Sequence, residues 1–247
     1  MTKPKINKTT CKRLLRVVDA GLVNGMGNPV PGQMCVEAAV CYALGQAHGD
    51  EPTCVGLAVR AAKIVLNDAS WSSDMARASG LRRVAVAQLG SDGLDQIEFV
   101  RRLAEHTIRR IVPMALRAVA AVVPSHSAKL ILAADGCEQA GTADSALAAS
   151  VAASAFCSYA ASVASAASIV SAAGYAAASY AAHVAASVAS ADASYAAHVA
   201  ASAASVASAA STASVADQLL IEMANIIEAV LVEMESPGCK YLYLCDE

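Results

Sequence analysis

The sequence has few aromatic residues and no long apolar run. Only 4% of its 247 residues are Phe, Trp or Tyr, although 56% are apolar. Much of that apolar fraction is alanine, which buries little surface per residue. No stretch of 18 or more strongly apolar residues occurs, which argues against a membrane-spanning helix. The basic start, residues 1–21, also lacks the apolar core and cleavage site of a signal peptide, so we expect a soluble cytoplasmic protein with no membrane partner.

Basic residues are almost missing from the second half of the chain. Residues 1–130 hold 17 Lys and Arg against 10 Asp and Glu, whereas residues 131–247 hold one Lys against 11 acidic residues. This asymmetry predicts two regions whose surfaces attract each other. The eight cysteines are even in number, but without a signal peptide we expect reduced thiols and no disulfide framework.

Strict alternation of apolar and polar residues, the pattern of a half-buried strand, persists nowhere in the chain. Helical periodicity is frequent, and Ser, Thr, Gly and Pro mark its limits. We therefore predict an all-α fold. The expected ordinary helices are 9–20, 34–45, 54–67, 72–89, 94–123, 126–139 and 217–235. Pro113 should kink or divide the fifth of them, and the tail KYLYLC (240–245) is expected as a short edge strand or an extended arm.

Residues 143–216 consist mainly of Ala, Ser, Val and Tyr, and the nonapeptide SYAAHVAAS occurs at 179–187 and again at 194–202. Because a helix turns about 100° per residue, a step of eleven returns to nearly the same face. The larger side chains follow that period and form one stripe: Tyr180, Val184, Val188, Ala191, Tyr195, Val199, Ser202 and Val206. The repeat thus predicts a helix face of small residues that permits close packing. It is either one long rod or a hairpin that turns near Gly174.

Composition divides the chain into three regions. These are a multi-helix N-terminal domain (1–140), an Ala/Ser-rich helical repeat region (141–216), and an amphipathic helix with a C-terminal tail (217–247). The expected function is structural or interaction-based: the Ala-rich helices pack closely against one another, as in a coiled coil, in a homo-oligomer. A different protein partner is an open alternative, and no cofactor is expected.

The best candidate for chemistry is PGQMC, residues 31–35. Cys35 is expected at a helix start, where the helix dipole favours the thiolate, behind the Gly- and Pro-rich loop at 21–32. Gln33 is a candidate donor to an oxyanion, and His48 is a candidate base. The stretch resembles the opening of papain-like cysteine peptidases, in which a Gln precedes a helix-capping Cys, although Gln33 stands closer to Cys35 than in that family. The resemblance implies the alternative function, a cysteine-centred hydrolase. A small-molecule-binding protein with its site around Gln33 and Cys35 belongs to the same alternative.

Two other kinds of site were weighed. The zinc-type ligands are Cys35, Cys41, His48 and Cys54, but their spacing exceeds the two to four residues that separate paired ligands in structural zinc sites. Nucleic-acid contact is conceivable through the eight arginines between residues 77 and 117, but acidic residues are interspersed with them. We favour pairing within the chain, with partners on the acidic C-terminal helix: Glu222, Glu228, Glu233 and Glu235.

Overall fold

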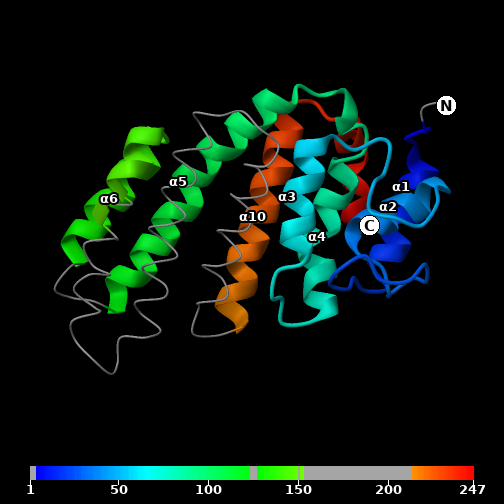
Figure 1. Ribbon diagram of the computed structural model, residues 1–247, viewed down its shortest axis with the longest axis horizontal. Helices are drawn as coiled ribbons and strands as arrows, with labels where there is room; N and C mark the ends of the chain where they lie inside the picture. The colour runs from blue at the N-terminus through cyan, green and yellow to red at the C-terminus, as the bar shows by residue number, and fades with distance from the viewer. Residues whose placement is uncertain (1–3, 123–126, 150, 153–212) are drawn as a thin grey trace.

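The computed structural model describes residues 4–122, 127–149, 151–152 and 213–247, and the regular elements of that part are helices (Figure 1). They are α1 (Lys8–Val18), α2 (Val36–Leu44), α3 (Leu57–Asn67), α4 (Asp74–Ala87), η1 (Ser91–Gly93), α5 (Gln96–Val122), α6 (Ser127–Ala140), α10 (Ala213–Glu233) and η2 (Pro237–Cys245). The predicted all-α class is confirmed for these residues, in which strand-type pairing is limited to an isolated bridge between Gly27 and Met34. None of the described helices is both long enough and apolar enough to span a lipid bilayer. The repeated nonapeptide and its stripe lie outside the described residues.

The helices are arranged side by side along the long axis of the molecule (Figure 1). The pair α5 and α6 occupies one end, α10, α3 and α4 lie in the middle, and α1 and α2 occupy the other end, near both chain termini. Among the elements that the structure describes, α5 and α6 make the most extensive contact, and α10 packs on both α4 and α5. A single apolar core therefore runs through the described helices.

Local capping explains where several helices begin and end. The Asn7 side chain accepts a hydrogen bond from the Thr10 N–H (3.0 Å) at the start of α1, and Ser73 Oγ does the same for Ala76 N–H (3.0 Å) at the start of α4. These side chains satisfy N–H groups that have no partner inside the helix. Gly45 ends α2 with a φ of 71°, a left-handed conformation that glycine adopts without strain.

Pro113 neither divides α5 nor ends it, so the division that the sequence allowed does not occur. The helix runs from Gln96 to Val122 with Pro113 inside it. Buried side chains lie on both sides of the proline: Ile111, Val112, Leu116 and Ala120. We attribute the continuity to this packing, which offsets the hydrogen bond that proline cannot donate.

The C-terminal helix belongs to the same core as the N-terminal helices. Its buried face includes Leu220, Met223, Ile227 and Leu231. Near its start, the Asp217 carboxylate accepts hydrogen bonds from the backbone N–H (2.9 Å) and the hydroxyl of Ser72. The C-terminal helix and the N-terminal helices therefore share one core, although 145 positions separate Ser72 from Asp217 in the sequence.

The tail forms the 3₁₀ helix η2, so the expected edge strand or extended arm is wrong. Hydrogen bonds join the start of η2 to the end of α4. Ser236 Oγ, just before η2, donates to Ala87 O (2.6 Å), and Gly238 N–H, within η2, donates to Leu89 O (2.7 Å). A Cβ at Gly238 would lie 2.1 Å from Val86 O, so only glycine permits this approach. The tail thus satisfies carbonyls that the end of a helix leaves unpaired.

The acidic C-terminal helix pairs with arginines of the first half, as predicted. Arg83 forms an ion pair with Glu228 (2.9 Å) and Arg110 with Glu222. The remaining arginines between residues 77 and 117 also have carboxylate partners, which are Asp74, Asp19, Glu98, Glu105, Glu233, Asp135 and Glu138. Some of these pairs lie within one helix, such as Arg101–Glu98, and others join different helices, such as Arg102–Glu233.

Candidate functional site

Cys35 is the N-cap of α2, at the helix start that the sequence predicted. Its sulfur accepts a hydrogen bond from the Ala38 N–H (3.3 Å), and only 5% of the residue is exposed. Burial raises the pKa of the Cys35 thiol, and the backbone N–H groups of Ala38 and Glu37 oppose that rise without reversing it. The expectation of an accessible thiolate is therefore wrong, because desolvation of the charged sulfur outweighs the helix terminus.

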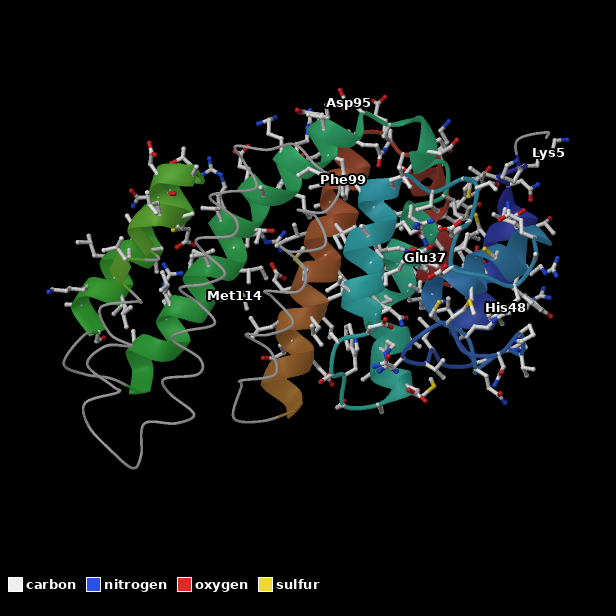
Figure 2. The ribbon with its side chains drawn as sticks, viewed as in Figure 1. Lys5, Glu37, His48, Asp95, Phe99 and Met114 are labelled. Carbon is white, nitrogen blue, oxygen red and sulfur yellow. The ribbon has the colours of Figure 1, made fainter. Side chains whose placement is uncertain are left out.

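Gln33 and His48 are not brought to the sulfur of Cys35. Both residues are exposed. The side-chain oxygen of Gln33 accepts a hydrogen bond from Asn28 Nδ2 (3.3 Å). His48 Nε2 lies 3.0 Å from Gly27 O. Figure 2 shows His48 in the loop region beside α1 and α2. Neither residue lines the cavity that Cys35 lines. The described residues therefore do not assemble the pair of nucleophile and base that the peptidase resemblance implies.

The N–H groups at the start of α2 are also occupied. Val36 N–H donates to Asn67 Oδ1 (3.1 Å), and Ala38 N–H donates to the sulfur of Cys35. An oxyanion needs donors that are free to turn toward it. This helix start thus lacks the free donors that an oxyanion pocket at Cys35 would use.

A fully buried ion pair lies beside Cys35, and the sequence reasoning missed it. Lys63 Nζ of α3 is 2.8 Å from Glu37 Oε1 of α2, and both side chains are 0% exposed. Glu37 appears among the packed helices in Figure 2. A signal for Lys63 was present, because it follows Val59 by four residues and precedes Leu66 by three, which places it on the apolar face of its helix. Glu37 likewise stands within an apolar run.

Burial acts on the two members of the pair in opposite directions. It raises the pKa of the Glu37 carboxyl and lowers the pKa of the Lys63 ammonium, and each charged partner opposes the shift of the other. The two groups lie at ion-pair distance, but their alignment is not that of a full hydrogen bond. Among the described residues, neither oxygen of the Glu37 carboxylate and no N–H of the Lys63 ammonium has a hydrogen-bond partner. An ammonium has three donors and a carboxylate several acceptor positions. Hydrogen-bonding capacity therefore remains unused in the interior.

Asn67, at the end of α3, holds the surroundings of the pair in place. Besides accepting from Val36, it donates to Val23 O (2.9 Å) and to Asp68 Oδ1 (2.9 Å). Buried Arg77 donates to Asn67 O (2.8 Å), which ties α4 to the same point. Asn67 thus joins the end of α3 to the start of α2 and to the loop before α2.

Trp71 anchors the segment between α3 and α4. Its indole N–H donates to Leu66 O (2.8 Å), and the ring is 8% exposed within the core. A Cβ at Gly80 would lie 2.4 Å from that ring, so α4 contacts it through a residue without a side chain. The α3–α4 connection is therefore fixed by packing as well as by hydrogen bonds.

A small cavity of about 20 Å³ adjoins the ion pair. Its lining is Gly25, Met26, Cys35, Val36, Glu37, Asp50, Ile64, Asn67 and Asp68. That volume holds about one water-sized group. A much wider hollow of about 1350 Å³ lies outside and includes His48, Glu51 and Asp92 in its lining; Asp50 borders both spaces.

The loop before α2 covers the cavity. Asp68 holds it from the α3 side, since its carboxylate accepts from Gly25 N–H (2.8 Å) and its carbonyl accepts from Asn24 Nδ2 (3.2 Å). Gly27 has a φ of 69°, and a Cβ there would lie 2.0 Å from Gln33 O, so the loop closes on itself only with glycine at this position.

The zinc hypothesis finds no support in this region. Within residues 4–122, 127–149, 151–152 and 213–247, no three His, Cys, Asp or Glu side chains gather as metal ligands. The seven described cysteines are free thiols. Cys35, Cys41, His48 and Cys54 are thus not assembled as a tetrahedral set.

No protein-family model, no curated protein and no solved structure matches this chain.

Proposed function

We propose that the protein is structural or interaction-based, and that its helical body anchors the Ala/Ser-rich region 141–216, whose helices pack closely against those of other copies. The observation that carries this proposal is that both flanks of the region are rooted in one core. On one flank, Ala146 and Ala149 are buried, and Cys137 of α6 contacts Ser145 O (3.3 Å). On the other flank, α10 packs on α4 and α5.

Exposed apolar side chains near the first flank support an association surface. Leu132 of α6 is 74% exposed, Leu147 is 55% exposed and Val151 is 64% exposed. Exposed apolar side chains favour contact with another apolar surface. The small residues of the repeat allow helices to approach closely, and the two features together suit a homo-oligomer.

The test is the native mass of the full chain and of three variants. Ala185→Leu and Ala200→Leu place bulk in the repeated nonapeptides, and overpacking a tight contact costs about 1–3 kcal/mol. We expect both variants to lower the oligomer mass in sedimentation equilibrium. Ala128→Leu, at an exposed position of α6, is the matched control and should leave the mass unchanged. A monomeric parent chain, or three variants that all keep the parent's mass, would contradict the proposal.

A second candidate function is small-molecule binding at the cavity beside Cys35, the non-catalytic form of the cysteine-centred alternative. The observation in its favour is the fully buried Glu37–Lys63 pair, with unused hydrogen-bonding capacity, next to a small cavity whose lining includes Glu37. Buried charges with perturbed pKa values are more frequent at functional sites than elsewhere. The buried thiol argues against the hydrolase form. Saturable stabilisation of the chain by a small polar compound tests this function.

A further inference from the structure

We propose that the cavity under the loop at residues 21–34 binds the ammonium head of a small primary amine. This inference rests on the second candidate function. Three acidic residues are among those that line the cavity: Glu37, Asp50 and Asp68. Lys63 is the only cation that forms an ion pair with any of them in the described part of the chain. The lining therefore carries more negative than positive charge.

A fully buried and incompletely satisfied carboxylate distinguishes this cavity from an ordinary acidic surface. Glu37 lines the cavity with 0% exposure, and its Oε2 has no hydrogen-bond partner among the described residues. A buried acceptor without a donor costs free energy that a bound N–H group would recover. An ammonium has three N–H donors, so it can donate to Glu37 Oε2 and to other acceptors of the lining at the same time.

The size and chemistry of the cavity favour an ammonium head over other charged groups. A volume of about 20 Å³ admits a group the size of water, which an –NH₃⁺ head matches and a guanidinium exceeds. An anion would meet three carboxylates, and the nearby N–H groups of Val36 and Ala38 already have acceptors. The described residues also offer no metal-binding group of three His, Cys, Asp or Glu side chains.

The amine's alkyl chain has a way out beside Gly25. A Cβ placed on Gly25 would meet no atom within 4 Å, so the space next to this residue is open. Exposed Asp68 lies at the same place, because its carboxylate accepts from Gly25 N–H. Asp50 borders both the cavity and the wide outer hollow. Asp50 and Asp68 thus stand at the outer side of the cavity, and Glu37 lies at its buried side.

The test is calorimetric titration and thermal unfolding of the full chain with four probes of similar size. The probes are n-butylammonium, tetramethylammonium, butanamide and butyrate. We expect n-butylammonium to bind at one site and to raise the melting temperature. Tetramethylammonium has the same charge but no N–H donor and should not bind, and the neutral and anionic probes should not bind either.

Variants locate the binding. Asp50→Asn should weaken n-butylammonium binding about tenfold, because a hydrogen bond to a charged group contributes strongly to affinity. Glu51→Gln removes the neighbouring exposed charge, which lies outside the cavity, and should change the affinity less than about threefold. Asp68→Asn provides a second variant at the outer side, with the same expectation as Asp50→Asn.

The outcomes separate this inference from the function on which it rests. Equal binding of tetramethylammonium, or equal loss of affinity in Glu51→Gln and Asp50→Asn, would overturn the ammonium site. Binding of butanamide or butyrate alone would also overturn it but would leave small-molecule binding standing. If none of the four probes binds, the ammonium site and the small-molecule function both fall.

Discussion

Lys63 Nζ lies 2.8 Å from Glu37 Oε1, and neither side chain is exposed to solvent. The two residues are 26 positions apart, on α3 and α2, so this ion pair exists only when the two helices have packed together. Desolvation of two charges is costly, and their attraction repays it only while both partners are present. The pair therefore makes the α2–α3 contact sensitive to the loss of either member.

Removal of one member should destabilise the fold more than removal of both. We expect Lys63→Met to lower the free energy of unfolding by about 3–5 kcal/mol, because Glu37 is left without its partner, and we expect the double variant Glu37→Leu/Lys63→Met to recover much of that loss. Urea unfolding measures both values. The control is Lys12→Met, whose ion pair with Glu247 is on the surface and should contribute at most about 1 kcal/mol. A double variant no more stable than Lys63→Met would contradict this account.

Two glycines on helices should respond to alanine in opposite ways. Gly80→Ala would place a Cβ 2.4 Å from the Trp71 ring, which a hydrogen bond to Leu66 O holds in place, so we expect a loss of about 1–3 kcal/mol. At Gly136 of α6 no atom lies within 4 Å of the added Cβ, and alanine should stabilise the helix by about 0.5–1 kcal/mol. Thermal unfolding of the two variants provides the comparison. The same sign of change in both would mean that helix propensity, and not the contact with Trp71, decides the outcome at Gly80.

Thiol reactivity should follow burial and not the helix dipole. Burial raises the pKa of Cys35, and it also raises the pKa of Cys41 and of Cys239 to about 11. Cys239 and Cys245 are only partly buried, whereas Cys35 is buried. In mass-mapped alkylation at neutral pH we expect Cys239 and Cys245 to react before Cys35, because burial raises the pKa of all three thiols and access then limits the reaction. Modification of Cys35 ahead of both would restore the cysteine-centred hydrolase.

Glu98 should make stability depend on pH in the acid range. Hydrogen bonds from Arg101 and Arg102 lower the pKa of Glu98 to about 2. Because the folded pKa is depressed, this contribution is complete above the ordinary value of 4.5 and is lost as pH falls toward 2. The group is near the surface, so we expect no more than about 1 kcal/mol, reduced further by salt. The stability difference between the parent chain and Glu98→Gln, measured by urea unfolding, should shrink from pH 7 to pH 3; an unchanged difference would contradict the assignment.

Local features of the sequence determined the helices and their limits. Ser73 caps α4, Gly45 ends α2, and the break after the C-terminal helix falls at Ser236. Capping rules predict these positions because a cap depends only on residues close to it in the sequence. Charge asymmetry also indicated the partners of the arginines, and Arg83 and Arg110 do pair with α10. Cys35 was correctly placed at a helix start for the same local reason.

Tertiary structure alone decided how deep each of these residues lies. Whether Cys35 is a reactive thiolate or a buried thiol depends on what covers it, and the covering loop is held by Asp68, which follows α3. The 3₁₀ tail forms because Ser236 and Gly238 meet the end of α4, about 150 residues away in sequence. Lys63 and Glu37 stand within apolar stretches of the sequence. A charged side chain is stable at such a buried position only when a residue of opposite charge on another helix packs against it. Periodicity and capping are properties of adjacent residues, whereas desolvation and charge pairing depend on which helix faces meet.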